Sequence, residues 1–139
     1  MDIVIRKYKS SDKKSIIRLW KEIFNPIDFH NKPEIAINMK IKHSDNLLFV
    51  AEKDKQLVGT VITGFDGHRG WIYSLAVSPN YRRRGIGTLL LKKAVNELEI
   101  LGCLKINLQI NRENSDVVNF YKKLGFNVED RVSMGLKLY

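Results

Sequence analysis

Residues 77–87 form a basic, glycine-containing turn in the middle of the chain, and they read Val77-Ser78-Pro79-Asn80-Tyr81-Arg82-Arg83-Arg84-Gly85-Ile86-Gly87. The segment Trp71 to Val77 is rich in β-branched and aromatic residues and predicts a strand. The amphipathic segment Ile86 to Leu101 predicts the longest helix of the chain, ended by Gly102. The turn therefore connects the end of a strand to the N-terminus of a helix.

A turn of this kind is suited to binding an anion. The first N–H groups of a helix have no intrahelical acceptor, and the helix dipole adds partial positive charge beside them. Gly85 and Gly87 have no Cβ to keep a phosphate from the backbone, and Arg82 to Arg84 add three positive charges. The spacing matches neither the three-glycine dinucleotide fingerprint nor a Walker motif. A solvated basic loop is the alternative interpretation.

The rest of the chain alternates strand and helix patterns. Strands are predicted at 3–5, 47–52, 57–65, 71–77 and 104–110, with one or two more in 126–139. Helices are predicted at 16–24, 35–41, 86–101 and 117–124. Short turns make the three middle strands an antiparallel meander, and the crossover through the long helix implies a parallel pair. We expect one α/β domain over residues 1–139, with a mixed, mostly antiparallel sheet of six or seven strands flanked by about four helices.

Composition limits the class of protein. The 139 residues are 44% hydrophobic and carry a formal net charge of +9, so the chain has enough apolar residues to fold as a single globular domain. Net charge alone fits nucleic acid, an acidic membrane surface or a polyanionic small ligand. The single cysteine, Cys103, excludes an internal disulfide, and no segment is apolar enough for a signal peptide or a membrane helix. We therefore expect a cytoplasmic protein.

Three motifs in register resemble the GNAT superfamily of N-acetyltransferases. Arg82 to Gly87 is similar to its R/Q-x-x-G-x-G/A signature, and Leu75 to Pro79 is similar to its central strand. Asn114 to Phe126 resembles its N-x(6)-Y-x-x-x-G-F block. The turn Asp66-Gly67-His68-Arg69-Gly70 is most similar to that of a group of small bacterial members. The resemblance spans essentially the whole chain.

This resemblance implies acetyl-coenzyme A as co-substrate and direct transfer of its acetyl group to an amine in a ternary complex. The main chain of the central strand would pair with the pantetheine arm, and the amides from Arg83 to Thr88 would hold the pyrophosphate. The cofactor-binding residues implied are Leu75, Ala76, Val77, Arg82, Arg83, Arg84, Gly85, Ile86, Gly87, Thr88 and Asn114. Tyr121 would be the general acid that protonates the departing thiolate.

The spacing of Asn114 and Tyr121 gives this pair separate support. Seven residues are almost two helical turns, so both side chains project from one side of a helix. A tyrosine hydroxyl with a pKa near 10 is able to donate to a thiol leaving group with a pKa near 8.5. A half-buried core aromatic is the alternative interpretation of Tyr121.

A general base is harder to find. Some relatives place a glutamate five positions before the asparagine or at the start of the central strand, where this chain has Gln109 and Trp71. Asp66 and His68 are the nearest candidates for a base. Asp66 has the alternative of ordering its turn or pairing with Arg69. An acceptor amine of low pKa or a water chain would make a dedicated base unnecessary.

Other chemistry has less support in the sequence. Cys103 invites a covalent acyl-enzyme, although its place after Gly102 favours a small buried residue. The three histidines, His30, His43 and His68, lack metal-ligand spacing, so we expect no metal.

Three function classes are compared. The first is an N-acetyltransferase acting on a small-molecule or protein amine, the second a non-catalytic acyl-coenzyme A sensor or partner-binding module, and the third a nucleic-acid binder. The third has only the charge and the arginine run in its favour. We expect a monomer or homodimer whose partners are acetyl-coenzyme A and an amine, with neither nucleic acid nor membrane among them.

Overall fold

The computed structural model describes residues 2–26 and 28–139. The chain divides into two compact units, residues 1–108 and residues 109–139, and each is described by itself below. That 1–139 form one domain stays a prediction. Among the described residues, no helix is both long enough and apolar enough to cross a membrane.

The first unit contains a mixed sheet whose strands are neighbours in the order β1-β2-β3-β4-β5. The three pairs from β1 to β4 are antiparallel, and β4 and β5 are parallel. The bounds are β1 Ile3–Lys7, β2 Leu48–Lys53, β3 Gln56–Phe65, β4 Gly70–Val77 and β5 Ile106–Leu108. The predicted meander and the predicted parallel pair are both confirmed.

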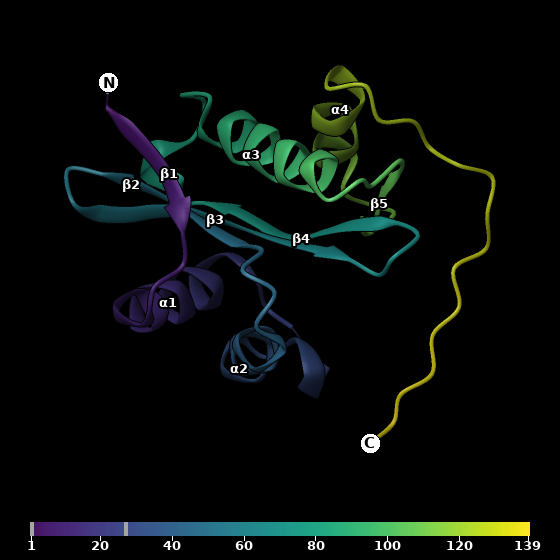
Figure 1. The fold of residues 1–139 in the computed structure, drawn as a ribbon, viewed down its shortest axis with the longest axis horizontal. Coiled ribbons are helices and arrows are strands. Elements are labelled where there is room, and N and C mark those ends of the chain that lie inside the picture. Colours follow the sequence, from purple (N-terminus) through teal and green to yellow (C-terminus); the bar gives the residue numbers. More distant parts are fainter. Residues whose placement is uncertain (1, 27) are drawn as a thin grey trace. The chain divides into compact units, whose positions relative to one another are not determined.

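Three helices cover the two faces of this sheet. They are α1 Lys13–Ile23, α2 Pro33–His43 and α3 Ile86–Ile100. Figure 1 shows α3 on one face, with α1 and α2 on the other. The face under α1 and α2 is a core of fully or nearly buried side chains: Ile16, Leu19, Trp20, Ile37, Leu48, Val50, Ile62 and Ala76.

The ends of α3 are set by two glycines in the left-handed region. Gly85 (φ 81°) precedes the first helical residue, and Gly102 (φ 86°) follows the last turn. Past the C-terminus, the N–H of Gly102 donates to the carbonyl of Glu99 (2.9 Å) and the N–H of Cys103 to that of Leu98 (3.0 Å). This is the Schellman pattern, so the helix ends where the sequence predicts.

The hairpin between β2 and β3 has a two-residue turn, Asp54 and Lys55. Both residues have positive φ, 50° and 65°. Consecutive left-handed residues in a two-residue loop are typical of a type I′ turn, whose twist matches that of the strands. The turn therefore fixes the register of this hairpin locally.

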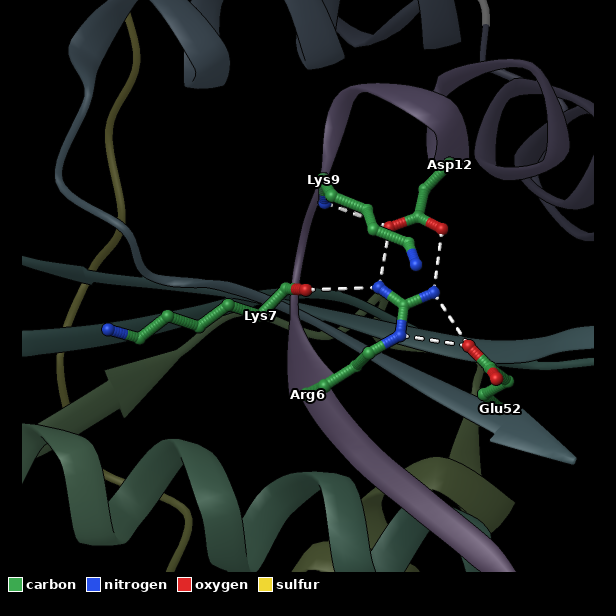
Figure 2. Close-up of polar contacts among 5 residues, drawn as sticks. All are labelled: Arg6, Lys7, Lys9, Asp12 and Glu52. Carbon is green, nitrogen blue, oxygen red and sulfur yellow. Dashed lines mark hydrogen bonds and ion pairs between the residues drawn. The ribbon is translucent and has the colours of Figure 1, made fainter. Parts of the chain in front are cut away.

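A partly buried ion cluster joins β1, β2 and the start of α1 (Figure 2). The Arg6 guanidinium donates to both carboxylate oxygens of Asp12 (2.8 Å each), and its Nε donates to Oε2 of Glu52 (2.8 Å). Asp12 also accepts the N–H of Lys9 (2.9 Å). Burial alone would raise the pKa of the Asp12 carboxyl, but the hydrogen bonds from Arg6 and Lys9 outweigh it and the pKa is lowered.

The second unit contains one helix, α4 Ser115–Lys123. Tyr121 packs edge-to-face between Phe120 and Phe126, with ring centroids 5.2 and 5.3 Å apart. The described residues therefore give four helices in all, as predicted.

The predicted count of six or seven strands is wrong, because the described residues contain five. The strand predicted at 104–110 is limited to β5, and Leu104 is 97% exposed. Residues 126–139 contain no strand, and their alternating apolar side chains at Val132, Met134, Leu136 and Leu138 are 86–91% exposed. Alternation defines an apolar face, but a strand also needs a partner for its main-chain groups.

Candidate active site

The junction between β4 and α3 carries free backbone N–H groups. The first intrahelical hydrogen bond of α3 runs from the N–H of Leu89 to the carbonyl of Gly85 (3.0 Å). The N–H groups of Ile86, Gly87 and Thr88 come before it and therefore have no intrahelical acceptor. The positive end of the helix dipole adds to the attraction of this site for an anion.

The loop before the helix contains two left-handed residues. Arg83 has φ 62° and Gly85 has φ 81°, whereas Arg82 is extended, with φ −69° and ψ 160°. A Cβ built at Gly85 would meet no protein atom within 4 Å, so the space in front of it is open.

The three arginines have different contacts. Arg82 donates from Nε to the carbonyl of Val77 (3.2 Å), which ties the loop to the end of β4. The Arg84 guanidinium lies 5.3 Å from the centre of the Tyr81 ring, and Lys53 lies 5.6 Å from the same centre. Arg83 has no hydrogen bond or ion pair with any described residue. Arg83 is thus the arginine whose side chain is not already engaged.

The strand that leads into this loop has one open edge. β4 pairs with β3 along most of its length, but it pairs with β5 only at Gly70, Trp71 and Ile72. From Tyr73 to Val77 that second edge has no strand partner among the described residues. An edge of this kind presents N–H and C=O groups that are able to pair with an extended ligand.

A bulge interrupts β4 within this open segment. Ile62 pairs with Tyr73 and Thr60 pairs with Ala76. The two pairs are three residues apart on β4 but only two residues apart on β3, so β4 contains one extra residue. Ser74 has φ 46°, in the left-handed region. The bulge bends β4 and leaves one of its residues outside the ladder.

Comparison with known proteins identifies the family of the chain. The family model described as "Acetyltransferase (GNAT) family" matches residues 14–126. An acetyltransferase of Pectobacterium atrosepticum is 36% identical over 136 residues, covering 96% of this chain and 94% of the relative. The chain belongs to the GNAT family of acetyltransferases.

Further relatives of this GNAT chain agree. An acetyltransferase of Yersinia enterocolitica is 35% identical with the same coverage. Among solved structures, the PaiA N-acetyltransferase of Thermoplasma acidophilum, determined in complex with coenzyme A, has a TM-score of 0.81 at 27% identity. That comparison covers 95% of this chain and 94% of the other. The predicted superfamily is confirmed, whereas the group defined by the turn at 66–70 stays a prediction.

The predicted site residues fall into two sets. Leu75 to Val77 and Arg82 to Thr88 lie along one continuous strand-loop-helix segment of the first unit. In the second unit, Asn114 is the N-cap of α4 and Tyr121 lies in its last turn. Asn114 occupies the N-cap position, but its side chain makes no capping hydrogen bond. Its exposed amide is therefore not used by the helix.

Tyr121 is only 6% exposed, and burial raises the pKa of its hydroxyl to about 12. The hydroxyl accordingly keeps its proton at neutral pH and is present as a donor. Both interpretations from the sequence, a general acid and a core aromatic, are compatible with this position, and the acid role stays a prediction.

The two candidate bases lie in the turn before β4. Oδ1 of Asp66 accepts the N–H groups of Arg69 (2.7 Å) and His68 (2.8 Å), and Oδ2 accepts Nε1 of Trp71 (3.1 Å). These hydrogen bonds, led by that of Arg69, lower the pKa of Asp66 to about 2. A carboxylate of such low basicity is a poor proton acceptor, so the contacts favour the turn-ordering interpretation.

Sequence reasoning missed two side chains behind the β4 bulge. Nε1 of Trp20 donates to Oγ1 of Thr60 (2.9 Å), and that hydroxyl donates to the carbonyl of Ser74 (3.1 Å). Trp20 lies in the helix predicted at 16–24 and Thr60 in the strand predicted at 57–65, and neither prediction pairs the two side chains. No local pattern signals a contact between residues forty positions apart.

Two further observations concern other chemistry. Cys103 is buried, and its Sγ lies 3.2 Å from the carbonyl of Lys105, which suits a small interior residue. Within residues 2–26 and 28–139, no group of three or more His, Cys, Asp or Glu side chains is placed to hold a metal ion.

Proposed function

We propose that the chain is an acetyl-coenzyme A-dependent N-acetyltransferase that transfers the acetyl group directly, in a ternary complex, to a primary amine of a small molecule, a protein or a peptide. The observation that carries the proposal is the open edge of β4 from Tyr73 to Val77, which runs directly into the unpaired amides at the start of α3. An extended arm ending in phosphates fits such a surface. Membership of the GNAT family and the coenzyme A complex of the Thermoplasma acidophilum relative support the same ligand.

The binding roles follow from this surface. The main chain of Leu75 to Val77 would pair with the pantetheine arm, as a peptide adds to a sheet edge. The amides from Arg83 to Thr88 would receive the pyrophosphate, and the Arg83 side chain is available to reach it. The exposed amide of Asn114 would bind the cofactor arm.

The proposed chemistry involves two proton transfers, one from the amine and one to the departing thiolate. The amine attacks in its neutral form, and backbone N–H groups of β4 would stabilise negative charge on the carbonyl oxygen. Tyr121 would donate its proton as the thiolate leaves, because its hydroxyl is neutral at the working pH. Asp66 is assigned to its turn, and the amine loses its proton to water or to His68.

Two measurements test the proposal. Acetyl-coenzyme A at 100 times its dissociation constant should stabilise the protein by about 2.7 kcal/mol. For a domain of this size that is a rise in Tm of roughly 5 to 10 °C. Steady release of free thiol from acetyl-coenzyme A with a panel of amines and peptides then measures transfer. A protein whose Tm is unchanged by acetyl-coenzyme A would contradict the proposal.

The second candidate is a non-catalytic acyl-coenzyme A-binding module. Two features favour this candidate. Asp66 is weakly basic and already accepts hydrogen bonds within its turn. Gln109 and Trp71 stand where some relatives have glutamate. Both candidates predict the rise in Tm. Thiol release that depends on an added amine supports the enzyme, and binding without release supports the module.

A further inference from the structure

The hydroxyl of Thr60, inside the first unit, both accepts and donates a hydrogen bond. The side chain lies on β3 and has no exposed surface. Its oxygen accepts the indole N–H of Trp20 (2.9 Å), and its one proton is donated to the carbonyl of Ser74 (3.1 Å). Trp20 is itself 1% exposed, so water does not compete for either bond. The indole thereby orients the hydroxyl toward β4.

The acceptor of this hydrogen bond is the strained residue of the β4 bulge. Ser74 has φ 46°, a conformation that costs a residue with a Cβ and persists only where its surroundings hold it. The register shift around Ser74 takes that residue out of regular pairing with β3. The Thr60 hydroxyl gives its carbonyl a partner that the ladder does not supply.

We propose that Thr60, oriented by Trp20, is a positioning residue for acetyl transfer, because it fixes the bulge that aims the backbone groups of β4 at the thioester. Ser74 lies directly before Leu75 to Val77, the segment that we propose pairs with the pantetheine arm. A change of backbone angle at Ser74 rotates the N–H and C=O groups that follow it. This inference rests on the proposed function and adds two residues to its site.

Thr63 supplies a control within the same strand. It is also a fully buried threonine of β3, three positions further on. Its hydroxyl has no hydrogen-bond partner among the described residues. Replacing Thr63 by valine removes an unpaired polar atom, whereas the same replacement at Thr60 removes a hydroxyl bonded on both sides. The two substitutions exchange the same residue types at equally buried positions and differ in the hydrogen bonds that they remove.

The experiment compares kcat and KM for acetyl-coenzyme A in the wild type and in Thr60→Val, Thr60→Ser, Trp20→Phe and Thr63→Val. The acceptor is whichever amine of the panel supports thiol release by the wild type. We expect Thr60→Val to lower kcat about tenfold, the factor set by about 1.4 kcal/mol of barrier, with KM changed less than about twofold. Thr60→Ser should restore kcat to within about threefold of the wild type, because serine keeps the donor. Trp20→Phe should lower kcat and Thr63→Val should leave it unchanged.

All variants are assayed at a temperature below their unfolding transitions, so that kcat reports on folded protein. A purely structural role for Thr60 would lower Tm without moving kcat of the folded protein, and that outcome overturns the inference. So does a serine variant as impaired as the valine variant, or an equal loss at Thr63. If the wild type releases no thiol with any amine, the proposed function and this inference both fail. If it does and Thr60→Val matches it, only this inference fails.

Discussion

Tyr121 is the residue whose chemistry burial changes most clearly. Its ring lies between Phe120 and Phe126, and the hydroxyl has a pKa of about 12. The Tyr121 hydroxyl is therefore protonated at neutral pH and available as a hydrogen-bond donor. A hydroxyl with this pKa is a weak acid, so the proposed acid role requires it to lie at the sulfur of the thioester.

The variant Tyr121→Phe should lower kcat by about 100-fold, the lower end of the contribution of a positioned general acid. The dissociation constant of coenzyme A should change little, because the phenyl ring keeps the packing. Stopped-flow or steady-state thiol release measures the first quantity and calorimetry the second. Tyr8→Phe, at the end of β1, is the control and should keep kcat. Full kcat in Tyr121→Phe would exclude the acid role.

Single residues also mark where sequence reasoning ends. The place of Gly85 directly before the long helix is predicted from the sequence, and its φ of 81° is one that glycine adopts without strain. Ser74 could not be predicted, since serine does not signal a left-handed bulge. The partners that hold it, Trp20 and Thr60, come from other elements. A non-local register shift creates this feature, and no local pattern reports it.

At the scale of elements, α3 has a glycine with positive φ at each end, Gly85 and Gly102. Neither would bring a new Cβ within 4 Å of another protein atom. Alanine at either position should thus cost about 1 to 2 kcal/mol of stability through backbone strain alone. Only the N-terminal glycine faces the proposed phosphate site.

We therefore expect Gly85→Ala to weaken coenzyme A binding by about tenfold or more. Gly102→Ala, the matched control, should destabilise the protein similarly and bind coenzyme A as the wild type does. Titration calorimetry and urea unfolding measure the two effects. Equal affinities in the two variants would place the phosphate elsewhere.

The cluster of Arg6, Asp12 and Glu52 holds β1, β2 and the start of α1 together, and its stability should depend on pH. The pKa of Asp12 is lowered in the folded protein, so its contribution is present above the unfolded value of about 3.9 and is lost as pH falls through the folded pKa. Asp12→Asn should cost about 1 to 3 kcal/mol at pH 7. The gap should narrow below about pH 4.

Urea unfolding of the wild type and Asp12→Asn from pH 3 to pH 7 measures this gap, with exposed Asp2→Asn as the control. A gap that stays constant over the whole range would show that charge is not what the cluster contributes.

Elements with their own end signals could be predicted, and those that depend on a partner could not. Both ends of α3 follow from Gly85 and Gly102. In contrast, the apolar alternation at 104–110 predicts a longer strand than β5. The observed strand is short because it pairs with β4 only at Gly70 to Ile72. Residues 126–139 alternate in the same way and have no strand partner among the described residues. Periodicity gives the face of a strand but says nothing of its neighbour.

For the whole molecule, the effect of the net charge of +9 on ligand binding depends on where the charged side chains lie. Arg82 and Arg84 are held by Val77 and Tyr81, which leaves Arg83 as the arginine of the loop without such a contact. We expect a small number of side-chain contacts with phosphate, because the proposed site consists mainly of backbone amides. This differs from a nucleic-acid groove, in which many side chains each neutralise a phosphate.

Raising salt from about 50 to 500 mM should accordingly weaken coenzyme A binding only severalfold, since screening removes few charge contacts. Arg83→Gln should weaken binding at low salt and reduce this salt dependence, whereas Lys105→Gln, near the far end of α3, should not. Calorimetry at four salt concentrations gives the slopes. A steep slope together with tight binding of duplex DNA would revive the nucleic-acid class.

The type I′ turn at Asp54 and Lys55 has a kinetic consequence. It lets β2 and β3 meet across two residues, whereas β1 reaches β2 only after the forty residues between Lys7 and Leu48 are gathered. Loop-closure entropy therefore favours this hairpin as the first long-range structure to form and β1 as a late addition. Lys55→Gly, which relieves the left-handed strain, should speed refolding, and Ile5→Val should mainly speed unfolding. During synthesis, β1 would leave the ribosome first yet wait for a strand made much later.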